Sequence, residues 1–176
     1  MSGKAGVGKD YIIQNVFAPR HYAQVSFAWH FKIWIVSTGQ ATYDEVFHTK
    51  PPHIRHLLQQ EGTERGRKVY GDNIWVDTLF NWIKLWSESG TVVGSDGVSR
   101  FIIGDVRFRN EAKRLEEYGG KLIRISSNRL SRLTSEQQQH ISETDLDNYY
   151  FKYHITNNIG TSTSNLEEQL HKQGIV

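Results

Sequence analysis

Residues 100–125 carry the pattern that most restricts the fold of this chain. A short apolar run (RFIIG, residues 100–104) is followed by the helical stretch NEAKRLEEY, by Gly119-Gly120, and by the alternating run KLIRI (residues 121–125). A strand, a helix and a strand of these lengths predict one crossover unit whose two strands run parallel. We therefore expect an α/β fold with three layers and a mostly parallel sheet.

Helical periodicity predicts most of the other elements. The longest helix is expected over residues 72–88, where Trp and Leu side chains recur at helical spacing. Shorter helices are expected over residues 27–35 and after Pro52, with Gly62 as the stop of the second one. Two segments have the form of capping boxes, namely Thr-x-x-Glu at residues 42–45 and Ser-x-x-Glu at residues 164–167.

Two further β elements are expected from local patterns. Residues 153–156 have the composition of a last strand. Residues 91–93 and 99–101 flank a turn at residues 95–97, which indicates a hairpin.

Composition excludes several classes of protein. The 176 residues predict a single domain over residues 1–176, and the 38% of hydrophobic residues and five Trp predict a packed core. Since the chain contains no Cys, it has neither disulfides nor a Cys-based zinc site, and we expect a cytoplasmic protein. The net charge of +2 and the scattered Lys and Arg residues argue against nucleic-acid binding. No apolar run has the roughly 20 residues of a membrane span.

The segment GKAGVGKD matches the phosphate-binding pattern Gly-x-x-x-x-Gly-Lys. In such a loop, backbone N–H groups and a helix N-terminus surround the phosphates of ATP, and Lys9 reaches the β- and γ-phosphoryl oxygens. Asp10 stands where a hydroxyl usually binds Mg²⁺, so Asp10 is the candidate metal ligand. A flexible glycine-rich terminus is the alternative interpretation. The candidate ATP-binding residues are Gly3, Lys4, Ala5, Gly6, Val7, Gly8, Lys9 and Asp10.

The position of this loop departs from the usual arrangement. A phosphate-binding loop normally follows a buried strand, whereas only Met1 and Ser2 precede Gly3. We therefore expect the first strand of the sheet to be missing.

Asp105, Arg107 and Glu111 form a second candidate cluster. Asp105 follows an expected strand, where α/β sheets place ligand-binding residues, and Glu111 falls in the first turn of the next helix. A carboxylate there can accept a sugar hydroxyl or bind Mg²⁺, and a guanidinium can hold two phosphate oxygens. The alternative is a surface ion pair at a helix start. Because the same chain carries the glycine-rich loop, we favour a substrate site.

Further candidates lie in polar segments. Arg67 can contact phosphate, and Trp75 can stack on a base, although Trp75 is equally suited to the core. Residues 126–139 suit a mobile lid, in which Arg129 and Arg132 would stabilise the transferring phosphoryl group. An ordinary solvated loop is the alternative.

Several segments, in the same order, resemble the deoxynucleoside monophosphate kinases of bacteriophages. The four segments are GKAGVGKD, HLLQQEGTERGRKVYGDNIWVD, FIIGDVRFRNEAKRLEEYGGKLIRI and HISETDLDNYYFKYHITNNIGTSTSNLEEQL. The most specific parts are the block Asp-Val-Arg-Phe-x-Asn-Glu in the third segment and the block His-Ile-Ser-Glu in the fourth. The resemblance implies a nucleoside monophosphate kinase-like P-loop fold, ATP and Mg²⁺ as the donor complex, a deoxynucleoside monophosphate as the acceptor, and a location in the host cytoplasm. It implies that Lys9 is the P-loop lysine, and that the acceptor is bound by Trp75, Asp105, Arg107 and Glu111.

Other functions stay open at this point. The loop also resembles that of phosphomevalonate kinases, so the acceptor can be another small phosphorylated molecule. The family commonly has Thr where this chain has Tyr11, which favours, as a different class of answer, a nucleotide-binding module without catalysis. The sequence leaves open whether the chain forms a homodimer through its Trp-rich helix.

Overall fold

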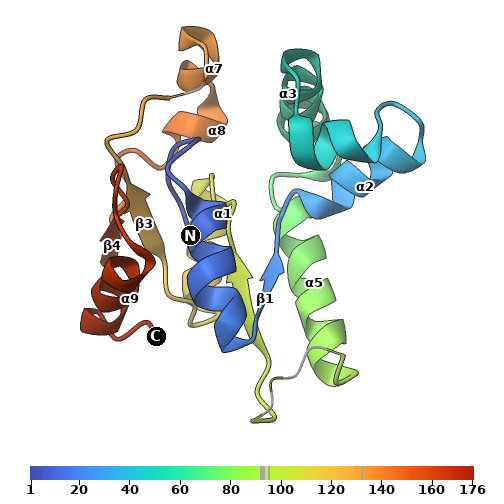
Figure 1. Ribbon diagram of the computed structural model, residues 1–176. Coiled ribbons are helices and arrows are strands. Elements are labelled where there is room, and N and C mark those ends of the chain that lie inside the picture. The colour runs from blue at the N-terminus through green and yellow to red at the C-terminus, as the bar shows by residue number, and fades with distance from the viewer. Residues whose placement is uncertain (92–93, 95, 132) are drawn as a thin grey trace. The chain divides into compact units, whose positions relative to one another are not determined.

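The computed structural model describes residues 1–91, 94, 96–131 and 133–176 (Figure 1). The chain separates into two compact units, the first made of residues 1–25 and 86–176 and the second of residues 26–85. This division does not test the single-domain prediction, which stays a prediction. Arg132 and residues 92–93, which are most of the strand expected at residues 91–93, lie outside the described residues.

The strands of the first unit form two parallel pairs. β1 (Tyr22–Val25) pairs with β2 (Arg100–Ile103), and β3 (Ile123–Ser126) pairs with β4 (Tyr153–Thr156). An α/β fold with parallel strands is therefore confirmed. The strands expected at residues 100–104 and 121–125 are present as β2 and β3, but they do not pair with each other, since β2 pairs with β1 and β3 pairs with β4.

Residues 1–2 lie between these two pairs of strands. Ser2 forms an isolated parallel bridge with Arg124 of β3. The Met1 nitrogen donates a hydrogen bond to Ile103 O at the end of β2, and the Met1 carbonyl accepts one from Val106 N at 3.3 Å. The residues directly before the glycine-rich loop thus hydrogen-bond to β3 on one side and to the end of β2 on the other.

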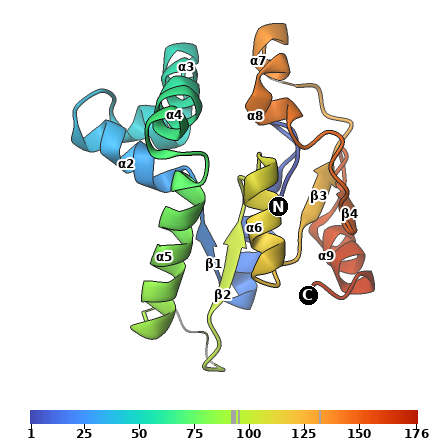
Figure 2. The ribbon, with the colours of Figure 1, turned by 180° about the vertical axis from the view of Figure 1, so that it is seen from behind.

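Helices lie on both sides of these strands. α1 (Lys9–Ile12) continues through a π-helical turn, η1 (Ile13–Phe17), and a 3₁₀ turn, η2 (Ala18–Arg20). Figure 1 shows α1 in front of the strands, and Figure 2 shows α6 (Arg109–Glu117) in front of them when the view is reversed. Apolar side chains of the α1 and η1 stretch, of strands β2 to β4 and of α9 (Thr163–Lys172) share one core, which includes Ile12, Val16, Phe17, Ile102, Ile125, Ile155, Leu166 and Leu170.

One local expectation in the first unit is wrong. The cap of α9 is Ser162, whose Oγ accepts a hydrogen bond from Asn165 N at 3.2 Å, and the expected box at residues 164–167 is not used. The hairpin expected at residues 91–101 stays a prediction, because most of its first arm lies outside the described residues, while its second arm overlaps β2, which pairs in parallel with β1. The sequence pattern had not indicated β1, a short strand of mixed polarity.

The second unit is helical in the described residues. It contains α2 (Trp29–Ser37), η3 (Glu45–Thr49), α3 (Pro52–Gln59), η4 (Gln60–Arg65), α4 (Gly66–Tyr70) and most of α5 (Ile74–Glu88). The helices expected near residues 27–35, after Pro52 and over residues 72–88 are confirmed. The capping box at residues 42–45 is also confirmed, since Glu45 N donates to Thr42 Oγ1 at 3.3 Å and Thr42 N donates to Glu45 Oε2 at 2.8 Å.

Gly62 does not stop the helix as expected. The helical path continues through η4 into α4. A Cβ atom at Gly62 would lie 2.8 Å from the Phe31 ring, and one at Gly66 would lie 2.3 Å from the Trp75 ring. These glycines therefore allow aromatic rings to pack against the backbone. Among the helices of the described residues, we find none with both the length and the apolar character needed to span a membrane.

Candidate functional site

The glycine-rich loop lies between the Ser2 bridge and the first turn of α1. Gly6 and Gly8 have φ angles of +85° and +86°, which residues other than glycine rarely adopt. A Cβ atom at Gly8 would lie only 2.3 Å from Asn157 Nδ2, whereas one at Gly6 would meet nothing within 4 Å. Gly8 is thus required both by its backbone angle and by the approach of Asn157, and Gly6 leaves the outside of the loop open.

Asn157 fastens the loop from the carboxyl end of β4. Its side chain Nδ2 donates to Val7 O at 2.9 Å, and its backbone N donates to Ser126 O at 2.9 Å. The residue is 1% exposed, and its Oδ1 atom is buried with no hydrogen-bond partner in the described part of the chain. Sequence reasoning missed Asn157. The available signal was a polar side chain directly after an apolar strand, the same signal that pointed to Asp105.

Lys9 is held inside the loop by carbonyl groups. Its Nζ donates to Gly3 O at 2.6 Å and to Lys4 O at 3.0 Å. Burial lowers the pKa of Lys9 to about 8, and the neighbouring Arg107 guanidinium lowers it as well, while nearby carboxylates act in the opposite direction. A cation that is both desolvated and close to a second cation is poised to gain from a bound anion.

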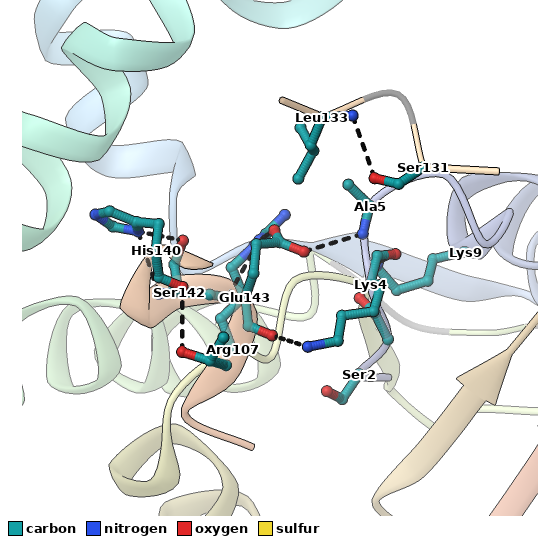
Figure 3. A network of polar contacts seen from close by, with 12 residues as sticks. Ser2, Lys4, Ala5, Lys9, Arg107, Ser131, Leu133, His140, Ser142 and Glu143 are labelled. Atoms are coloured by element: carbon teal, nitrogen blue, oxygen red, sulfur yellow. Dashed lines mark hydrogen bonds and ion pairs between the residues drawn. The ribbon is translucent and has the colours of Figure 1, made fainter. Parts of the chain in front are cut away.

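A carboxylate from a distant segment also reaches the loop. In Figure 3, the Glu143 side chain, from α8 (Ile141–Thr144), points toward both Ala5 and Arg107. Ala5 N donates to Glu143 Oε2 at 3.1 Å, and Arg107 Nη1 forms an ion pair with Glu143 Oε1. Lys4 Nζ donates to Glu143 O at 2.5 Å and lies 2.5 Å from Asp147 Oδ1. Sequence reasoning had marked the His-Ile-Ser-Glu block as distinctive, but it gave Glu143 no role.

The three residues of the Asp105 cluster have different surroundings. Glu111 is 3% exposed, and its Oε2 accepts hydrogen bonds from Arg107 N at 2.7 Å and Phe108 N at 3.0 Å, which caps the start of α6. Half-buried Asp105 follows β2 and acts electrostatically on Lys9, as Arg107 does. The structure thus brings Lys9, Asp105 and Arg107 together, while these Glu111 contacts hold the backbone that carries Arg107.

Arg67 and Trp75 belong to the second unit. Arg67 is 8% exposed, and its Nη1 donates to Asp72 O at 2.8 Å. Trp75 Nε1 donates to Gly62 O at 2.6 Å, and its ring packs against Phe31 with centroids 5.1 Å apart. These contacts secure both side chains inside their own unit, and their roles toward a substrate stay predictions.

The remaining candidates lie at the surface. Asp10 is exposed in the first turn of α1 and is one of the carboxylates that act on Lys9, which keeps it a candidate to hold a metal ion. The next residue, Tyr11, forms a hydrogen bond between its hydroxyl and Thr163 Oγ1 at 2.8 Å. Arg129 is exposed, and its backbone N donates to Ser127 Oγ at 3.2 Å.

No protein-family model matches this sequence, and a search of curated proteins finds no match to it. The resemblance to phage kinases therefore depends on the motifs alone. The function has to be argued from the geometry of the loop and its neighbours.

Proposed function

We propose that this chain is an ATP-dependent kinase that transfers the terminal phosphoryl group of ATP to a small phosphorylated acceptor, a deoxynucleoside monophosphate. The observation that carries the proposal is the approach of Lys9 and Arg107 at the glycine-rich loop. Arg107 lowers the pKa of Lys9, so the chain holds two cations near each other at the N-terminus of a helical stretch. Arg107 also pairs with Glu143, which accepts the Ala5 N–H of the loop, and two cations at the start of a helix favour the binding of phosphates.

The order of the strands supports the proposal. Because residues 1–2 hydrogen-bond to β3 and to the end of β2, the parallel elements follow the order β1, β2, residues 1–2, β3, β4. Ligands of α/β sheets bind at the carboxyl ends of the strands, where the chain reverses its direction of progress across the sheet. The glycine-rich loop follows the middle position of this order. This placement favours the three-layer P-loop arrangement that the motifs predict.

The loop has features that fit the phosphates of ATP. Positive φ angles at Gly6 and Gly8 turn the backbone, and the open space outside Gly6 permits an anion to approach. ATP supplies the phosphoryl group. In this proposal the loop N–H groups and Lys9 neutralise charge on the β- and γ-phosphoryl oxygens, which is where phosphoryl transfer accumulates charge.

Magnesium would be held near the same loop. Asp10 and Asp105 are oxygen donors of the kind that Mg²⁺ prefers, and both act electrostatically on Lys9. Mg²⁺, when bound, would neutralise further charge on the phosphates. The Tyr11 hydroxyl is engaged with Thr163, so we do not assign it to the metal.

The acceptor would be held by Arg107. A guanidinium can bind two oxygens of one phosphate group, and Asp105 can accept a hydrogen bond from the sugar. The resemblance implies that Trp75 contacts the acceptor, and Arg67 stays a candidate for a phosphate contact from its residue type alone. Residues 126–139, with Arg129 and Arg132, would close over the phosphates and exclude water.

The test is an assay of ADP release with Mg²⁺ at near-neutral pH across the deoxy- and ribonucleoside monophosphates. We expect ADP to form only when ATP, Mg²⁺ and an accepted deoxynucleoside monophosphate are all present. ADP formed with phosphomevalonate but with no nucleotide acceptor would replace the proposed acceptor. Tight ATP binding without ADP formation under any condition would instead establish a nucleotide-binding module without catalysis.

A further inference from the structure

Glu143 occupies an unusual place for a carboxylate. Its side chain is 5% exposed, yet both oxygens have partners on different segments of the chain. One oxygen accepts the Ala5 N–H of the glycine-rich loop, and the other pairs with the Arg107 guanidinium. A buried carboxylate is tolerated only when its charge and its lone pairs are satisfied in this way.

The local sequence builds a rigid support for this carboxylate. Ser142 N donates to His140 Nδ1 at 3.2 Å, and the Ser142 hydroxyl lies 2.8 Å from the same nitrogen. Glu143 N donates to His140 O at 2.8 Å. The His-Ile-Ser-Glu block thus folds into a capped turn, and Figure 3 shows the His140, Ser142 and Glu143 side chains of this turn. We infer that the turn limits the directions in which Glu143 can point.

Lys4 strengthens the same connection from the loop side. Its ammonium group donates to the Glu143 carbonyl at 2.5 Å and to Asp147 Oδ2 at 2.7 Å. The loop and residues 143–147 are therefore joined through the Ala5 amide and the Lys4 ammonium group, and Glu143 also pairs with Arg107.

We propose that Glu143 is a positioning residue that holds Arg107 in register with the phosphate-binding loop. The proposal rests on the proposed function, because it assigns Arg107 to the acceptor's phosphate. In this role Glu143 transfers no proton to or from the substrates and forms no covalent bond with them. It limits the side-chain freedom of Arg107, so that the guanidinium is already placed beside the loop when the acceptor arrives.

Glu143→Gln separates this role from a general effect on the loop. The amide keeps one oxygen for Ala5 N–H, but it loses the charge that pairs with Arg107. We expect the KM for the acceptor to rise about tenfold, and the KM for ATP to change by less than about threefold. Equal increases in both KM values, or no change in either, would overturn the proposal.

Asp145→Asn is the matched control. Asp145 is two residues away and pairs with Arg109 at 3.6 Å, so the substitution removes the same charge from a neighbouring ion pair. We expect it to leave both KM values unchanged. Combining Glu143→Gln with Arg107→Lys should raise the acceptor KM no further than Arg107→Lys alone, because both changes disable one guanidinium. Additive effects would count against a shared role.

A measurement that needs no activity keeps the two proposals separate. The hydrogen-exchange rate of the Ala5 amide, followed by NMR, should rise at least about tenfold in Glu143→Ala and stay unchanged in Asp145→Asn. If the unaltered chain forms no ADP, the proposed function fails. If the Ala5 exchange rate is unchanged in Glu143→Ala, the proposed contact between Glu143 and the loop is excluded. If Glu143→Ala does not fold, the pair Glu143→Ala with Arg107→Ala, which leaves neither charge alone, provides the same measurement.

Discussion

The glycine-rich loop and residues 126–139 are both expected to contact ATP, but the loop and the later part of that segment, residues 129–139, are held in opposite ways. The loop is fastened by residues far away in the sequence, since the hydrogen bond from Asn157 to Val7 spans 150 positions and that from Ala5 to Glu143 spans 138. In the described part of residues 129–139, the hydrogen bonds are local, such as that from Leu133 N to Ser131 Oγ and the capping box between Thr134 and Gln137.

This difference makes the glycine-rich loop a fixed site, whereas residues 129–139 can move at a small cost in free energy. Long-range contacts set the loop geometry before a ligand binds, which avoids reorganisation during the reaction. A segment whose hydrogen bonds are local and whose side chains are exposed can shift without breaking the core. The predictions below therefore expect large effects from changes in the loop and small effects from changes in residues 126–139.

Lys9→Ala should have the largest effect. The side chain is proposed to act on charge at the transferring phosphoryl group, so we expect turnover to fall about 10²–10³-fold. Stability should change little, because the loss of hydrogen bonds to Gly3 and Lys4 is offset by removal of a buried cation. Turnover and thermal unfolding are measured together, with the exposed Lys113→Ala on α6 as the control. Near-normal turnover would exclude the loop from the mechanism.

Comparing Gly8→Ala with Gly6→Ala tests the attachment to Asn157. Both glycines have nearly the same positive φ, so each substitution should lower the free energy of unfolding by about 1–3 kcal/mol through backbone strain. Only at Gly8 does the new Cβ meet Asn157, so Gly8→Ala should cost more and should also weaken ADP binding. Urea unfolding and ADP titration measure the two effects.

Adding Asn157→Ala to Gly8→Ala isolates the steric part of this cost. Removing the Asn157 side chain frees the space that the new Cβ would need. The double variant should therefore lose less stability than the sum of the single variants. Equal costs for Gly6→Ala and Gly8→Ala would mean that the loop is not fixed by Asn157.

Lys9 also gives the loop a pH response. Its pKa is about 8 in the folded chain against an ordinary value of 10.5, so between these values the unfolded chain binds more protons than the folded one. The free energy of unfolding attributable to Lys9 should therefore rise as the pH increases from about 8 to about 10.5. Urea unfolding of the unaltered chain and of Lys9→Met across this range measures the contribution as their difference. A difference that does not vary with pH would contradict the burial of the ammonium group.

What could be predicted from the sequence follows the same division, since local features were found and contacts between distant residues were not. The α5 helix was found from the helical spacing of its apolar residues, and β2 and β4 were found from short runs of strand-forming residues, all of which are local properties. The glycine-rich loop was found from another local property, the spacing of its Gly and Lys residues. The partners of the strands were not found, since pairing of β2 with β1 depends on contacts across the whole unit.

The candidate site divides in the same way. Asp105 and Arg107 follow a recognisable strand, and the structure places them near Lys9. Glu143 meets Arg107 across 36 positions, and neither spacing nor periodicity carries that information. Gly62 shows the opposite error, since a glycine needed for contact with Phe31 has the same sequence signal as a helix stop.

Arg129→Ala should have the smallest effect. Arg129 is exposed, and its described hydrogen bond uses the backbone, so thermal unfolding should not change. If residues 126–139 close over the phosphates, loss of this guanidinium should lower turnover only a few-fold, to about one third to one tenth, and should raise the share of ATP that is hydrolysed by water. Arg129→Lys keeps the positive charge and should restore most of the turnover. The ratio of ADP formed to phosphorylated acceptor formed measures the leak, and a ratio identical in all three chains would return residues 126–139 to the status of an ordinary surface loop.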